Sequence, residues 1–205
     1  MFEFVDKVVF INLDKRIDRR AHMETLTSIF GDKVIRFSAI KESPGYVGCT
    51  KSHIEVLKMA LENKWKNVLV LEDDIAWNNF EEGYSQLDKL ASSEYDCILL
   101  GGTYVDYDKD TSRVKASRTT AAYLVNGHYI PTLLSNFEEG LVGLIQIQCK
   151  ETFSLDTYWS KLQARDVWYI IQPCLVYQIP GYSDIVENNV NYMSEYLEGK
   201  TYWAW

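Results

Sequence analysis

The sequence has few of the features that mark linkers, disulfide frameworks or membrane spans. Its four prolines and 11 glycines are scattered, so no flexible linker is visible and we expect a single domain over residues 1–205. The four cysteines, at positions 49, 97, 149 and 174, form no Cys-x-x-Cys pair, which argues against zinc knuckles and thiol redox sites. No apolar run approaches the roughly 18 residues of a transmembrane helix, and no secretory signal is visible. These absences predict a cytoplasmic protein with reduced cysteines.

Basic residues are also scarce. Lys and Arg total 21 against 29 Asp and Glu, which gives a net charge of −8. Non-specific nucleic-acid binding and docking on anionic lipid both need basic surface, so we expect neither partner. Hydrophobic residues make up 47% of the chain and charged residues 24%, which is typical of a folded globular protein.

Short apolar runs alternate with amphipathic segments along the chain. This pattern predicts an α/β protein with a mostly parallel sheet flanked by helices, and such sheets bind ligands at the carboxyl ends of their strands. The strands are expected at residues 8–13, 34–37, 68–71, 97–100, 121–125, 167–171 and 175–178. The helices are expected at residues 17–30, 50–63, 80–91, 131–137 and 156–165.

Local signals make four further predictions. Residues 45–48 read as a flexible loop before the second helix, and Ser52 with Glu55 matches a capping box at its start. The polar segment 106–118 reads as a mobile loop. Asp156 is expected to cap the helix that follows it.

The acidic triplet Glu72-Asp73-Asp74 directly follows the apolar run 68–71. Adjacent carboxylates repel one another, and Mg²⁺ or Mn²⁺, which prefer oxygen ligands, would compensate them. Side chains alternate along an extended segment, so Glu72 and Asp74 are expected to point the same way. An acidic turn without a metal is the alternative.

Three other polar segments follow or precede expected elements. Residues 12–20 end the first strand and carry arginines suited to phosphate, although these arginines would equally suit a solvated helix face. Residues 48–53 open a helix and direct Lys51 and His53 toward the strand ends, although an ordinary capped helix start explains them as well. Residues 178–184 form a turn in which Ser183 and Asp184 suit a metal or phosphate, or form the turn alone.

Taken together, these motifs resemble glycosyltransferase family 25. VVFINLDKRIDRR, GCTKSH and VLVLEDD occur here in the order and at the separations seen in that family, which includes lipooligosaccharide and procollagen galactosyltransferases. The PGYSDI segment is most similar to members encoded by giant DNA viruses. The resemblance spans residues 6–192 and is consistent with an enzyme of a bacterium or a virus-infected cell.

The resemblance implies a glycosyltransferase-A fold and a metal-dependent, inverting transfer of a hexose from a UDP-sugar. Galactose is favoured over glucose, and the acceptor would be a saccharide or hydroxylysine. It implies Mn²⁺, with Mg²⁺ as the alternative, held by Asp74 first, Glu72 second, and Asp184. The donor-binding candidates are Asn12, Leu13, Arg16, Arg19, Lys51, His53, Asp73, Gln178 and Ser183.

Inverting transfer also needs a base for the acceptor hydroxyl, and Asp156 is our candidate. Its neighbours Tyr158 and Trp159 would stack on a sugar, or Trp159 would belong to the core. The aromatic segment 201–205 suggests a homodimer contact. The competing interpretation is an inactive nucleotide-sugar-binding or scaffold protein of the same fold.

Overall fold

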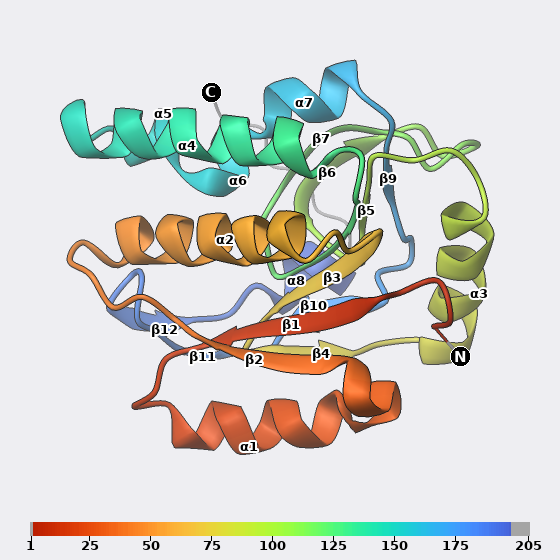
Figure 1. Cartoon of the computed structure of the whole chain (residues 1–205), viewed down its shortest axis with the longest axis horizontal. Coiled ribbons are helices and arrows are strands. Elements are labelled where there is room, and N and C mark those ends of the chain that lie inside the picture. Colours follow the sequence, from red (N-terminus) through yellow and green to blue (C-terminus); the bar gives the residue numbers. More distant parts are fainter. Residues whose placement is uncertain (1, 198–205) are drawn as a thin grey trace.

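A computed structural model of the chain describes residues 2–197, and within them six strands form one mixed sheet in the order β2-β1-β3-β8-β5-β9 (Figure 1). Strand β8 runs antiparallel to both of its neighbours, and the other adjacent pairs are parallel. The expected α/β class with a mostly parallel sheet is confirmed. The strands are β1 (Lys7–Asn12), β2 (Val34–Ser38), β3 (Asn67–Glu72), β5 (Cys97–Leu99), β8 (Ala122–Asn126) and β9 (Trp168–Ile170).

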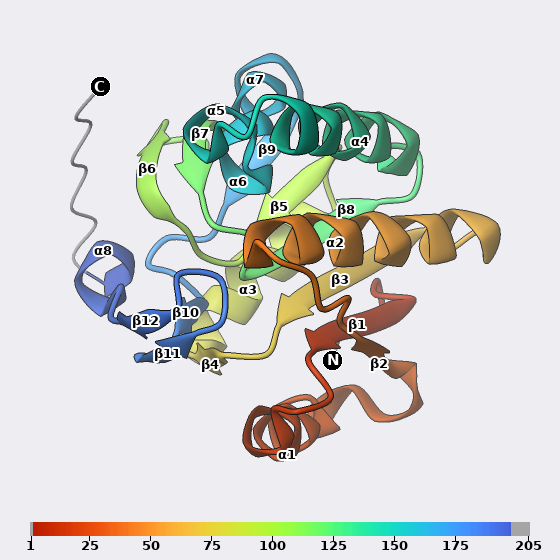
Figure 2. The ribbon, with the colours of Figure 1, turned by 90° about the vertical axis from the view of Figure 1, so that its left-hand side faces the viewer.

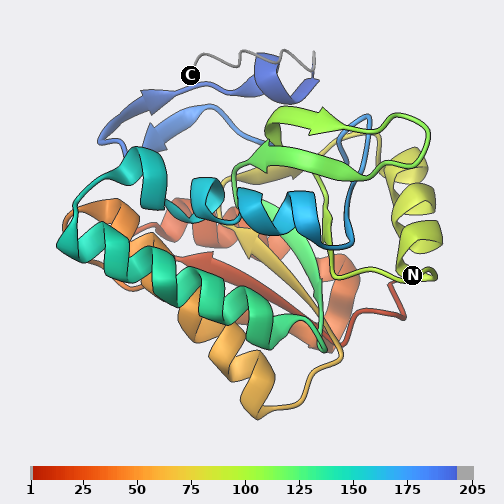
Figure 3. The ribbon, with the colours of Figure 1, turned by 90° about the horizontal axis from the view of Figure 1, so that it is seen from above.

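Helices cover both faces of this sheet, which is why its central strands are continuously apolar. Helices α2 (Gly45–Glu62) and α4 (Ile130–Gln146) lie side by side over one face (Figure 3). The opposite face carries α1 (Ile17–Leu26), a 3₁₀ segment (Ser28–Lys33) and α3 (Phe80–Ala91). Within residues 2–197, no helix is long and apolar enough to cross a membrane.

The strand residues divide between two buried clusters as the pleat requires. Val9 packs with Ile54 and Leu57 beneath α2, whereas the adjacent Val8 packs with Met23 of α1 on the other face. The helix predicted at residues 17–30 is only partly correct. Ile17 is 71% exposed, and the regular helix ends at Leu26.

Helix α2 corrects the prediction of a loop at residues 45–48. These residues form its first turn, after Pro44. The capping box is also wrong, because Ser52 is buried inside the helix, where its hydroxyl donates to Gly48 O and accepts from Ile40 N. The sequence signal was misleading because a serine that bonds to a neighbouring loop looks like one that caps a helix.

Gly48 is required by a close approach of backbones. A Cβ atom at this position would lie 2.4 Å from Ile40 O, which cannot move without shifting the segment before α2. We therefore expect Gly48→Ala to lower the free energy of unfolding by about 1–3 kcal/mol in urea titrations. The matched control is Gly181→Ala, where an added Cβ meets nothing within 4 Å. Equal stability of the two variants would contradict this interpretation.

The polar segment at 106–118 is not a loop throughout. Its ends belong to the hairpin β6 (Thr103–Tyr107) and β7 (Val114–Arg118). Ser117 is fully buried, and its backbone N–H donates to Gln163 Oε1 at 2.7 Å. Strand β7 was predicted as a loop because its residues are polar, but these polar groups form hydrogen bonds inside the protein.

The region after α4 is broken into short helices. They are α5 (Lys150–Phe153), α6 (Leu155–Tyr158) and α7 (Ser160–Arg165). Asp156 lies in the first turn of α6, whose N-cap is Ser154, so the predicted capping role is wrong. Trp159 is fully buried against Trp168 and donates its indole N–H to Ser117 O, so it belongs to the core and cannot stack on a sugar.

The last segments return to the carboxyl ends of β1 and β3. Strand β4 (Ile75–Trp77) pairs with β10 (Val176–Gln178), and β11 (Gly181–Ser183) pairs with β12 (Asn188–Val190). The β11–β12 hairpin lies beside the starts of α1 and α2 (Figure 1), and α8 (Met193–Leu197) follows it. The proposed dimer contact at 201–205 lies outside the described residues.

Candidate active site

A cavity of about 440 Å³ lies where parallel strands β1 and β3 end, between the start of α2 and the β11–β12 hairpin. Figure 2 shows how these elements are arranged. Its volume is in the range of small-molecule sites. Its lining includes the acidic triplet, the start of helix α2, the end of β10 and the β11–β12 hairpin. The lining residues most relevant to chemistry are Arg19, Cys49, His53, Glu72, Asp74 and Gln178.

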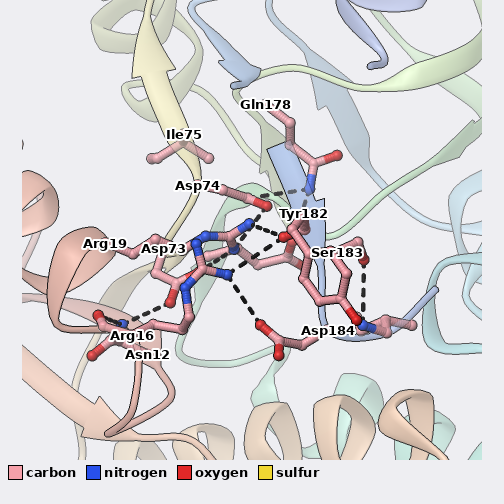
Figure 4. Close-up of polar contacts among 12 residues, drawn as sticks. Asn12, Arg16, Arg19, Asp73, Asp74, Ile75, Gln178, Tyr182, Ser183 and Asp184 are labelled. Carbon is pink, nitrogen blue, oxygen red and sulfur yellow. Dashed lines mark hydrogen bonds and ion pairs between the residues drawn. The ribbon is translucent and has the colours of Figure 1, made fainter. Parts of the chain in front are cut away.

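The acidic side chains divide as strand alternation predicts. Glu72 Oε2 and Asp74 Oδ1 both accept from the same atom, Gln178 Nε2, at 3.1 and 3.3 Å. Figure 4 shows the contact between Asp74 and Gln178. Asp73 turns instead toward Asn12, whose amide donates to it at 2.7 Å. Pairing of Gln178 with Ile75 in the β10–β4 ladder fixes this approach.

Arg19 of α1 is the cation that faces the triplet. Its Nη1 lies 2.7 Å from Asp73 Oδ1 and 3.0 Å from Asp74 Oδ2, and its Nη2 donates to Tyr182 O at 2.8 Å. Arg19 thus joins the end of β3 to the β11–β12 hairpin. The structure places this arginine in the cavity and not on a solvated helix face.

One guanidinium does not neutralise three adjacent carboxylates. Burial, together with the charge of Glu72, raises the pKa of Asp74 to about 7. Burial alone would also raise the pKa of Glu72, but nearby His53 and the hydroxyl of Thr120 outweigh it and hold that pKa below its ordinary value. The site therefore retains a surplus of negative charge next to the cavity.

These donors fit an oxygen-preferring divalent cation. One oxygen of Glu72 and one of Asp74 converge on a single nitrogen, so both carboxylates reach the same region. Mg²⁺ and Mn²⁺ need only one or two protein carboxylates when phosphate oxygens complete their shell. Glu72 and Asp74 are the residues that would hold such a cation.

The other predicted metal ligand, Asp184, is placed differently. Its carboxylate is ion-paired with Lys15 and with Arg16, the latter at 3.1 Å, and these cations lower its pKa although burial opposes them. Among residues 2–197, no contact joins Asp184 to Glu72 or Asp74. Asp184 lines the same cavity, but its carboxylate already has two cationic partners.

The donor-binding candidates have different positions relative to the cavity. Leu13, Ser183 and Gln178 line the cavity with His53 and the acidic triplet. Asn12 is buried. Its amide N–H donates to Asp73 and its amide oxygen accepts from Arg36, so it positions Asp73 without lining the cavity.

Two basic candidates and one hydroxyl are engaged elsewhere. Lys51 does not line the cavity and pairs with Glu42 at 2.6 Å. Arg16 binds Asp18 and Asp184 and does not itself line the cavity. The hydroxyl of Ser183 accepts two backbone N–H groups of its own turn.

Asp156 does not line the cavity but is linked to the acidic centre through Thr119. Its Oδ2 accepts from Thr119 N at 3.2 Å, and Thr119 Oγ1 contacts Gln178 Oε1 at 3.4 Å. Thr119 has a positive φ of 74°, which is uncommon for a branched residue and is often found at functional sites. One residue therefore links the candidate base to the side chain that bridges Glu72 and Asp74.

Sequence reasoning assigned no role to several residues of the site. Thr120 donates to Glu72 Oε1 at 2.6 Å, and Cys49 lines the cavity. Two further residues contact the site without lining the cavity. Arg36 donates to Asn12 Oδ1, and the hydroxyl of Tyr123 lies beside His53 Nδ1. A signal existed only for Cys49, which stands one helical turn before His53 and so shares its face.

Over part of its length the sequence is similar to a family of glycosyltransferases. The model for glycosyltransferase family 25 (LPS biosynthesis protein) matches residues 42–128, a segment that contains α2 and the acidic triplet. The predicted resemblance to that family is confirmed over this segment.

One solved structure supports the fold. A glycosyltransferase involved in the glycosylation of the major capsid of PBCV-1 superposes with a TM-score of 0.52 at 11% identity, covering 82% of this chain and 81% of that one. The glycosyltransferase GlyE of Streptococcus pneumoniae TIGR4 gives a TM-score of 0.46 at 12% identity, covering 82% of this chain and 45% of that one. No curated protein matches the sequence.

Proposed function

We propose that the protein transfers a hexose from a UDP-sugar, with inversion, and that it uses Mn²⁺ or Mg²⁺. The observation that carries this proposal is the convergence of the Glu72 and Asp74 carboxylates at the wall of the cavity, beside Arg19. Such surplus negative charge would repel a diphosphate unless a divalent cation joined them.

Cleavage of the sugar–phosphate bond leaves the bonding electrons on the departing UDP. The cation, when bound, would supply Lewis-acid stabilisation of that charge. The protein contributes position: Glu72 and Asp74 hold the cation, and Arg19 fixes Asp74 against the β11–β12 hairpin. The lining residue Lys15 adds positive charge at the rim.

The acceptor hydroxyl must lose its proton as it attacks the anomeric carbon. We propose that Asp156 takes this proton. Its carboxylate contacts Thr119, which in turn contacts Gln178, and it has no cationic partner among residues 2–197. Galactose is the proposed sugar, glucose the alternative, and a saccharide or a hydroxylysine side chain the proposed acceptor.

Calorimetric titration of UDP tests the donor site. We expect binding with Mn²⁺ and none without it, because the cavity wall is acidic. Binding should be lost in Asp74→Ala and retained in Asp110→Asn, which changes an exposed carboxylate between β6 and β7. UDP-galactose and UDP-glucose, titrated in parallel, would identify the donor.

The same titration separates the alternatives. Equal UDP binding without Mn²⁺, or in Asp74→Ala, would refute the metal assignment. Metal-dependent binding without UDP release across a broad acceptor panel would indicate an inactive nucleotide-sugar-binding protein. Absence of UDP binding under every condition would indicate another donor or a scaffold.

A further inference from the structure

A second set of metal-ligand atoms adjoins the acidic triplet. Cys49 Sγ, a ring nitrogen of His53 and a carboxylate oxygen of Glu72 lie within 4.8 Å of one another. Cys49 and His53 are four residues apart in α2, so they share one helix face, and β3 brings Glu72 to that face. The three side chains line the cavity.

His53 is oriented as a ligating histidine would be. It is 1% exposed, and its Nδ1 lies 2.9 Å from the hydroxyl of Tyr123. Within the described part of the chain its Nε2 has no hydrogen-bond partner, and it lies 3.7 Å from Glu72 Oε1. Metal-bound histidines commonly use the second ring nitrogen in this way, which fixes the tautomer and leaves a lone pair on the first.

The chemistry of this set differs from that of Glu72 with Asp74. Sulfur and imidazole ligands select zinc and similar thiophilic cations, whereas an all-oxygen set selects Mg²⁺ or Mn²⁺. Three protein ligands would leave the fourth position of a tetrahedral zinc ion open. Because all three residues line the cavity, that position would face the cavity.

We propose that Cys49, His53 and Glu72 form a binding site for a thiophilic divalent cation, with Zn²⁺ as the natural candidate. Binding forms a bond from the cation to Cys49 Sγ and releases the thiol proton to solvent. Glu72 contributes Oε1, which Thr120 also contacts, while its Oε2 faces Gln178. The site is distinct from the proposed Mn²⁺ site but shares one carboxylate with it.

The shared carboxylate makes the two sites antagonistic. A cation at Cys49 and His53 withdraws negative charge from Glu72 and repels a second cation nearby. We therefore expect Zn²⁺ to weaken Mn²⁺-dependent UDP binding. This consequence rests on the proposed function, whereas the thiophilic site itself does not.

Titration with Co²⁺, a spectroscopic substitute for Zn²⁺, tests the site without UDP or turnover. We expect one equivalent to bind with a thiolate-to-cobalt charge-transfer band that Zn²⁺ abolishes. The band should disappear in Cys49→Ser and persist in Cys149→Ser, the matched control at a cysteine outside the cavity. Tyr123→Phe, which removes only the partner of His53 Nδ1, should weaken Co²⁺ binding by about 10- to 100-fold.

Thermal unfolding of each variant ensures that only folded protein is compared. Absence of the band in the wild-type protein, or an equal band in Cys49→Ser, would overturn the proposal. If the band behaves as expected but Zn²⁺ leaves Mn²⁺-dependent UDP binding unchanged, the thiophilic site stands and the antagonism is refuted. If UDP does not bind at all, the proposed function fails and the cobalt result still decides the cation site.

Discussion

Asp156→Asn is expected to lower the turnover number by about 10²- to 10⁴-fold, the usual contribution of a general base, while Mn²⁺-dependent UDP binding is unchanged. The amide keeps the size of the side chain. Its oxygen can accept from Thr119 N, and its NH2 group can donate to the Ser154 hydroxyl, which then accepts in place of donating, so the local fold should survive. It cannot accept the proton of an acceptor hydroxyl. Rates of UDP release at saturating donor and acceptor, with UDP titrations beside them, measure the two effects separately.

Two controls make this result specific. Asp110→Asn removes a carboxylate from the surface and should leave turnover unchanged. Ser154→Ala removes one hydrogen bond to Asp156 but keeps its carboxylate, so it should have a smaller effect than Asp156→Asn. Near-normal turnover of Asp156→Asn would refute Asp156 as the base, and parallel loss of UDP binding would indicate a role in holding the donor.

The centre of the fold could be predicted because its sequence signals are local. The runs that become β1 and β3 are continuously apolar, as strands covered on both faces must be. Parallel strands end at one edge, so Glu72–Asp74 could be placed beside the end of β1 before the structure was known. The antiparallel direction of β8 had no such signal, because it depends on the path of the intervening chain.

The errors at Gly48 and Ser52 have a tertiary cause. Both residues face the backbone of the segment before α2, and Ile40 provides the contact in each case. Glycine and serine in a row of polar residues are typical of loops and caps when only neighbours in sequence are considered. The helix extends through them because packing outweighs these weak local preferences.

The candidate site was predicted as a set of residues but not as an arrangement. Asp184 was a plausible metal ligand by composition, and only the structure pairs it with Lys15 and Arg16. His53 was as consistent with an ordinary helix start as with a site, and its burial against Tyr123 is a contact across 70 residues. Contacts of this range leave no pattern in one sequence.

Arg19→Ala is expected to lower the free energy of unfolding by about 3 kcal/mol, the low end of the cost of leaving a buried charge without its partner. The low end applies because the side chains of Arg19, Asp73 and Asp74 remain 15%, 11% and 16% exposed. A domain of this size loses about 2–4 °C of melting temperature for each kcal/mol, so the midpoint should fall by about 6–12 °C. Scanning calorimetry without divalent cations measures the shift.

The neighbouring Arg20→Ala is the matched control for this second prediction. Arg20 pairs with Glu24 on the exposed surface of α1, and such a pair contributes about 0.3–0.5 kcal/mol, so its melting temperature should barely change. Similar losses in both variants would show that Arg19 is an ordinary surface residue.

Added Mn²⁺ should raise the melting temperature of Arg19→Ala more than that of the wild type, because a cation bound by Glu72 and Asp74 would replace the missing positive charge. Equal shifts would mean that Arg19 and the cation act on different carboxylates, and the proposed metal position would then be wrong even if the stability loss is as expected.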